Sequence, residues 1–151
     1  MKRQNSAAPL FCMGLLAGAF SASASAEPGR HSNLEGNWTV DIQNADCTFR
    51  GTANLMRDPD ADSYHGHLTT YHSCPGEFGP FQANQTIRVT FRGNDIFVSG
   101  KVEEVVAAHP EFYKPDFFLL KEDQSGKLVG TQMDSYGNSP ATWSRQSGGI
   151  S

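Results

Sequence analysis

The sequence predicts an all-β protein, a single small antiparallel meander of about eight short strands that closes into a barrel with one disulfide. Alternating apolar and polar residues recur in short runs, and residues typical of tight turns separate most of these runs. Convincing helical periodicity is scarce along the chain. A two-sheet sandwich also fits this pattern, but closure into a barrel is favoured because it leaves no exposed strand edge.

Residues 1–26 are expected to be a secretory signal peptide that is removed on export. Lys2 and Arg3 precede an apolar run over residues 10–20, and residues 24–26 match the small-residue pattern of a cleavage site. The apolar run is too short to cross a bilayer as a helix, so we expect no membrane insertion after cleavage. The alternative interpretation of this segment is a buried N-terminal helix.

The rest of the chain is expected to form one domain, because a chain of this size normally builds one hydrophobic core. Residues 27–33 are polar and contain proline and glycine, which indicates a flexible arm. The barrel domain is expected over residues 34–146 and a disordered tail over 147–151. The formal net charge of −4 becomes more negative once the basic leader is removed, which argues against nucleic acid and anionic membranes as partners.

Cys47 and Cys74 are expected to form a disulfide across one β-hairpin. The runs on either side of residues 58–62 alternate like paired strands, and the sequence of these five residues suits a turn. Antiparallel partners then have numbers that sum to about 120 or 121, which places Cys47 opposite Ser73 or Cys74. Two cysteines behind a signal peptide indicate a disulfide; the alternative is a thiol metal site or a redox pair, although Cys-x-x-Cys is absent from the sequence.

The clearest hairpin is expected over residues 87–100, with Gly93-Asn94 as its turn. If partners sum to 187, Phe91 lies opposite Ile96, and the apolar residues of both strands fall on one face. Agreement between the turn residues and the polarity of the faces fixes this register.

A second hairpin is expected from residues 117–122 and 127–132, with its turn over residues 123–126. Partners that sum to 249 would place Leu120 opposite Val129.

The remaining segments are less regular. Trp38 starts an alternating first strand over residues 36–42, and a loop is expected over residues 74–80. Residues 102–108 either extend the preceding strand or form a short helical turn. Residues 136–139 are expected to be a turn and residues 141–145 the closing strand.

The sequence Gly36-Asn37-Trp38 resembles the opening of lipocalin-like (calycin) barrels. Together with Leu34-Glu35, Cys47-Thr48-Phe49 and Cys74-Pro75-Gly76, it is most similar to the bacterial inhibitors of secreted metalloproteases. This resemblance implies a small periplasmic barrel in which a basic residue, here Arg145, packs over Trp38 through a cation–π contact. In those inhibitors the free N-terminal segment enters the protease cleft.

Two groups of side chains are candidate metal ligands. His65 and His67 alternate along one expected strand, so both imidazoles point to the same face and could hold a transition metal; otherwise they are solvent-facing polar residues. His72 has the opposite parity. Asp58, Asp60 and Asp62 alternate like calcium ligands, but the glycine and glutamate that an EF-hand requires are missing, which favours a solvated acidic turn.

Aromatic residues around a proline-rich loop are candidate contacts to a ligand or partner. Phe112, Tyr113 and Phe117 either form the lip of a cavity or close the core, and Trp38 and Arg145 complete the candidate set. None of the nucleophile, zinc-protease or phosphate-loop motifs is present.

These observations favour a non-enzymatic binding protein that is secreted or periplasmic and uses no cofactor. Its expected partner is a small apolar ligand or an exported protein, held at the mouth of the barrel. The alternatives are a periplasmic protease inhibitor, which the resemblance implies, and a metal-binding protein that uses His65 and His67. The sequence leaves open whether the barrel interior is hollow or filled by side chains.

Overall fold

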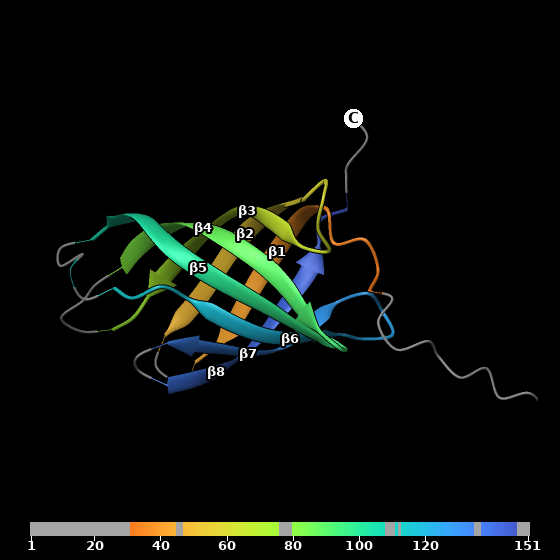
Figure 1. Ribbon diagram of the computed structural model, residues 1–151. Helices are drawn as coiled ribbons and strands as arrows, with labels where there is room; N and C mark the ends of the chain where they lie inside the picture. The colour runs from red at the N-terminus through yellow and green to blue at the C-terminus, as the bar shows by residue number, and fades with distance from the viewer. Residues whose placement is uncertain are drawn as a thin grey trace, which may run out of the picture.

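The protein is a closed, all-β barrel. The computed structural model describes residues 31–44, 47–75, 80–107, 111, 113–134 and 137–147. Eight antiparallel strands within these residues follow one another in chain order, and β8 pairs with β1 to close the barrel (Figure 1). They are β1 (Gly36–Gln43), β2 (Thr48–Arg57), β3 (Tyr64–Ser73), β4 (Pro80–Arg92), β5 (Asp95–Val106), β6 (Phe117–Glu122), β7 (Leu128–Asp134) and β8 (Gly137–Arg145). The predicted fold class is therefore confirmed.

The strand connections define two ends of the barrel. We call the end that carries the β1–β2, β3–β4, β5–β6 and β7–β8 connections the open end, and it lies at the left in Figure 1. The other three connections lie at the closed end, where residues 31–35 approach β1. The predicted leader, residues 27–30 of the predicted arm and residues 148–151 of the predicted tail lie outside the described residues. Within the part of the chain that is described, we find no helix with the length and hydrophobicity to span a bilayer.

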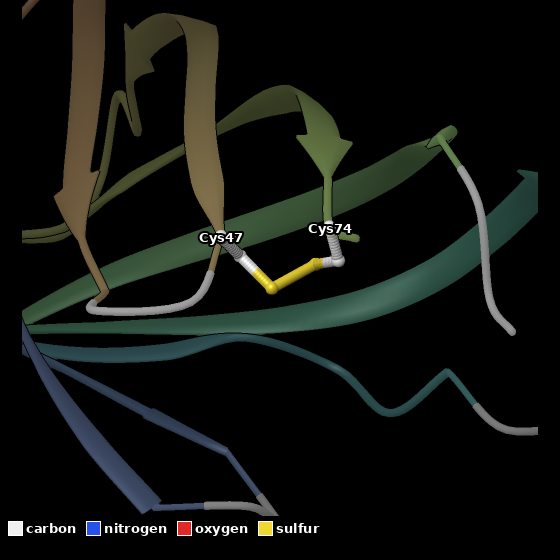
Figure 2. Close-up of a disulfide and its surroundings, with 2 residues drawn as sticks. All are labelled: Cys47 and Cys74. Carbon is white, nitrogen blue, oxygen red and sulfur yellow. A yellow bond between two sulfur atoms is a disulfide. The ribbon is translucent and has the colours of Figure 1, made fainter. Parts of the chain in front are cut away.

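The cysteine hairpin has the predicted register. Strands β2 and β3 pair with numbers that sum to 121, from Thr48 opposite Ser73 to Arg57 opposite Tyr64. Cys47 and Cys74 lie one position beyond the last pair, with their Cα atoms 4.3 Å apart, and form the disulfide shown in Figure 2. The closed loop spans 27 positions, for which the chain-entropy model gives a stabilisation of about 3 to 4 kcal/mol.

The two later hairpins differ in how well the sequence predicts them. Strands β4 and β5 pair Phe91 with Ile96, as expected from a sum of 187. The register predicted for β6 and β7 is wrong by one residue, because Leu120 pairs with Gly130 rather than with Val129. A one-residue shift exchanges the faces of a strand. Leu128 is therefore buried inside the barrel, and Val129 is on the outer face.

The turn explains this shift. Asp123 donates its backbone N–H to the carbonyl of Lys127, and Gly126 adopts a positive φ of 80° inside the loop that these two residues close. The Asp123 carboxylate also accepts the N–H groups of Ser125 and Lys127. The loop that Asp123 and Lys127 close holds three residues, with glycine in the left-handed conformation, whereas the predicted turn held four, and this difference shifts the register by one residue.

Three strands are longer than expected. β4 begins at Pro80, at the end of the segment expected to be a loop, and β5 continues to Val106, so residues 102–106 extend the strand rather than form a helical turn. The turn expected over residues 136–139 is wrong for its described part. Gly137 already pairs with Asp134, and its N–H donates to the Asp134 carboxylate, which starts β8 there.

The barrel interior changes from apolar to polar along its axis. Towards the closed end it is filled by side chains, including both tryptophans, with Phe118 packed edge-on against Trp143. Towards the open end the same inward-facing rows continue with polar side chains. These are Thr70, His72, Gln85, Asp116, Gln132 and Ser139. The interior is therefore filled in one half and polar in the other.

The closed end is sealed by the residues that precede β1. The guanidinium of Arg145 lies 4.5 Å from the centre of the Trp38 ring, the contact that the resemblance implies, and donates to the backbone carbonyls of Asn33 and Glu35. The His31 ring stacks on Phe91. The described end of the predicted arm is therefore held against the barrel.

Candidate functional site: a pocket at the open end

A pocket of about 280 Å³ opens between the strand ends at the open end of the barrel. This volume is close to the lower limit of about 300 Å³ for small-molecule sites in proteins. The described lining residues are Asn44, Cys47, Phe49, His72, Cys74, Pro75, Phe81, Val105, Ala107, Tyr113, Lys114, Asp116 and Asp134. Both cysteines of the disulfide are among these residues, so the disulfide forms part of the pocket wall.

His72 is the centre of the aromatic part of the wall. Its ring stacks on Phe81 with ring centres 4.2 Å apart, and Phe49 and Tyr113 meet it edge-on. Only 5% of His72 is exposed. The imidazole Nε2 is 2.8 Å from Thr70 Oγ1, whereas Nδ1 is buried and has no hydrogen-bond partner among the described residues.

Asp116 is the centre of the polar part of the wall. It directly precedes β6 and is almost fully buried. Its carboxylate accepts hydrogen bonds from Gln85 Nε2 at 2.6 Å, Tyr113 Oη at 2.6 Å and Gln132 Nε2 at 2.9 Å. Its backbone N–H donates to Gln85 Oε1. These bonds tie the end of the β5–β6 connection to β4 and β7, and so fix the polar wall in place.

Burial shifts the ionisation of these groups. Desolvation lowers the pKa of His72 to about 4, against a smaller opposing effect of the Asp134 carboxylate. Desolvation is also the main reason that the pKa of Tyr113 is raised, and the neighbouring Asp116 charge adds to it. The pKa of Asp116 is raised because desolvation outweighs its three hydrogen bonds. At neutral pH His72 is therefore a neutral imidazole and Tyr113 a neutral phenol.

The lowered pKa of His72 predicts a loss of stability in acid. Between its pKa of about 4 in the folded protein and its ordinary value of 6.5, the unfolded chain binds the proton more readily, so the free energy of unfolding falls as pH falls. From pH 7 to pH 4 this loss amounts to about 3 kcal/mol. Urea unfolding of the wild type and of His72→Phe at both pH values measures it. The raised pKa of Asp116 acts in the opposite direction, but equally in both proteins, so it cancels from their difference.

The free energy of unfolding of the wild type minus that of His72→Phe should therefore shrink or change sign between pH 7 and pH 4. An unchanged difference at the two pH values would show that His72 titrates as freely in the folded protein as in the unfolded chain.

The candidate contact residues of the sequence do not gather in one place. Tyr113 lines the pocket, as expected for a lip residue, and Phe112 lies outside the described residues. Phe117 points outward from β6, with 44% of its surface exposed. Trp38 and Arg145 lie together at the closed end, where Trp38 is fully buried.

His65 and His67 both point outward from β3, and so share a face as predicted. Asp58, from the preceding turn, hydrogen bonds to His65 Nδ1 and to the Ser63 hydroxyl. Over the described ranges, no group of three or more His, Cys, Asp or Glu side chains is arranged to hold a metal ion. Metal binding at His65 and His67 stays a prediction.

Sequence reasoning missed most of the polar wall. Gln85, Asp116 and Gln132 were not singled out, and His72 was considered only for its parity. The available signal was the inward row of β3, where Leu68 is followed at alternate positions by Thr70 and His72. These polar residues on a row that begins apolar mark where the barrel interior changes from an apolar to a polar lining.

Comparison with known proteins gives no relative of this chain. No protein-family model, no curated protein and no solved structure matches it. The closed eight-stranded antiparallel barrel is compatible with a lipocalin-like architecture.

Proposed function

We propose that the protein is an exported, non-enzymatic binding protein that holds a small, largely apolar ligand in the open-end pocket. The observation that carries this proposal is the asymmetry of the interior. Side chains fill the closed half, whereas the open half has a pocket with aromatic walls and a fixed set of buried polar groups. Small-molecule sites combine apolar linings with a few precisely oriented polar groups in this way.

The pKa values of His72 and Tyr113 make these two pocket residues unsuited to general acid or base catalysis at neutral pH. An efficient general acid or base has a pKa near the working pH. Burial lowers the pKa of His72 to about 4 and raises the pKa of Tyr113 above its already high ordinary value, so both pKa values lie far from neutral pH. We therefore expect no turnover of ester, amide or glycoside substrates by the purified protein.

Export is the second part of the proposal. The disulfide between Cys47 and Cys74 is typical of proteins in oxidising compartments. The signal peptide expected over residues 1–26 would deliver the chain to the periplasm or the medium. Protease inhibition, which the family resemblance implies, stays a prediction.

Two adjacent valines provide the test of the pocket. Val105 lines the pocket, whereas Val106 points outward with 58% of its surface exposed. We expect toluene, a small neutral aromatic probe, to bind the wild type, and Val105→Trp to reduce this binding at least tenfold because the indole fills the pocket. Val106→Trp adds the same side chain on the other face of the strand and should leave binding unchanged. Isothermal titration calorimetry measures all three affinities.

The proposal is wrong if the wild type does not bind toluene, or if the two tryptophan variants bind it equally well. Circular dichroism of each variant confirms that the barrel is retained.

A further inference from the structure

We propose that the disulfide is a redox switch of the open-end pocket: the oxidised protein binds the ligand, and reduction of the bond between Cys47 and Cys74 releases it. This inference rests on the proposed function and adds the regulation of the same pocket. It follows from the position of the two cysteines, which lie in the wall of the pocket itself.

Both cysteines continue the inward-facing rows that form the aromatic wall. The numbers of Cys47 and Cys74 sum to 121, as do those of the register pair Phe49 and His72, so the disulfide lies directly across the hairpin, two positions beyond that pair. Residues two positions apart on a strand point to the same face. All four residues line the pocket. The disulfide is therefore the outermost cross-link of the wall to which Phe49 and His72 belong.

The disulfide joins two connections at the rim of the pocket. The described pairing of β2 with β3 ends one position before each cysteine. Asn44 and Cys47 belong to the β1–β2 connection, Cys74 and Pro75 belong to the β3–β4 connection, and all four line the pocket. Figure 2 shows the bond between them at the ends of the two strands. Reduction therefore removes the covalent link between two parts of the pocket wall.

Reduction also changes the shape of the wall. Two thiol sulfurs keep van der Waals distance, so they cannot remain as close as two bonded sulfurs. The Cα atoms of Cys47 and Cys74 are 4.3 Å apart, and the adjoining strand pairs hold the backbone there. At least one cysteine side chain must therefore rotate, which alters the lining of a pocket of about 280 Å³.

The chemical step is thiol–disulfide exchange with a dithiol. A thiolate of the reductant attacks one cysteine sulfur, forms a mixed disulfide and expels the other cysteine as a thiolate, which takes up a proton. The second thiol of the reductant then displaces the remaining cysteine. Cys47 and Cys74 together gain two electrons and two protons, and the dithiol is oxidised to its cyclic disulfide.

The pocket and the disulfide protect each other. Both cysteines are partly exposed, and an occupant of the pocket covers the side of the bond that faces the pocket. A ligand that binds the oxidised protein more tightly must stabilise the disulfide against reduction by the same factor, because coupling between two sites is reciprocal. The switch can therefore be tested from either side.

The first experiment measures the affinity for toluene before and after reduction with dithiothreitol, by isothermal titration calorimetry. Alkylation and mass spectrometry of a sample give the redox state, and circular dichroism shows whether the barrel is retained. We expect reduction to weaken toluene binding about tenfold. The double variant Cys47→Ala/Cys74→Ala is the control, because it has no bond to reduce and dithiothreitol should leave its affinity unchanged.

A kinetic experiment keeps the test decisive if the reduced chain does not retain the barrel. Reduction by dithiothreitol is followed by trapping the new thiols with iodoacetamide. Toluene at ten times its dissociation constant leaves about a tenth of the pockets empty and should slow reduction several-fold. Val105→Trp fills the pocket and should slow reduction without toluene, whereas Val106→Trp, on the outer face, should not.

The direction of the Val105→Trp effect separates access through the pocket from reduction of the unfolded chain. An indole added to the pocket wall does not stabilise the barrel, so reduction through unfolding would be as fast as in the wild type or faster. Weaker toluene binding after reduction, together with slower reduction of Val105→Trp, supports the inference.

Two results overturn the inference while leaving the proposed function in place. One is a reduced barrel that binds toluene as tightly as the oxidised barrel or more tightly. The other is reduction of Val105→Trp at the rate of the wild type or above it. Failure of the oxidised wild type to bind toluene contradicts the proposed function, and the switch with it.

Discussion

Replacement of Asp116 by alanine is expected to lower the free energy of unfolding by about 3 kcal/mol. The change leaves Gln85 Nε2, Gln132 Nε2 and the Tyr113 hydroxyl without their shared acceptor in the barrel interior. A buried donor left unsatisfied costs about 1–3 kcal/mol, and three of them exceed the gain from no longer desolvating a carboxylate. The same change should abolish ligand binding, because Asp116 holds the polar wall of the pocket.

Urea unfolding monitored by circular dichroism measures this effect. Asp95→Ala is the control, because Asp95 is only partly buried and its partner, Lys121, is exposed, so the cost should stay below about 1 kcal/mol. A cost for Asp116→Ala as small as that of the control would mean that the network does not hold the open end together.

Replacement of Trp38 by alanine is expected to cost about 4 kcal/mol. The side chain is fully buried in the apolar half of the barrel, and its Nε1 donates to the carbonyl of Leu34 at 2.9 Å. Arg145 covers the ring on the solvent side. Removal of the indole therefore leaves a cavity, breaks a buried hydrogen bond and releases the segment before β1 from the closed end.

Thermal and urea unfolding measure the loss, and Thr39→Ala on the outer face of β1 is the control, with an expected change within about 0.5 kcal/mol. Arg145→Ala should cost less than Trp38→Ala, because it removes exposed contacts and leaves the indole in place. Equal costs for the two variants at Trp38 and Thr39 would contradict the assignment of Trp38 to the core.

Local sequence patterns predicted the fold wherever turn residues and face polarity agreed. The turn over residues 58–62 and the alternation of its flanking strands placed Cys47 beside Cys74, as observed. The β6–β7 register was missed because both strands carry apolar residues on both faces, so polarity could not reveal the shift. There the turn alone decides the register, through the Asp123–Lys127 closure.

The pocket was less predictable because its residues come from distant strands. His72, Gln85, Asp116 and Gln132 belong to β3, β4, the segment before β6 and β7, and they meet only when all the registers are correct. The barrel closure that brings them together depends on pairing of β1 with β8, which leaves no local signal in the sequence.

The amide spectrum of the ¹⁵N-labelled protein during titration with toluene tests the central claim most directly. We predict that the largest shift changes occur at Phe49, His72, Phe81 and neighbouring amides of the open end, and that the amide of Trp38 is unaffected. Shift changes centred on the exposed outer face around Phe117, or none at any amide, would contradict the claim that the open half of the barrel is a ligand site.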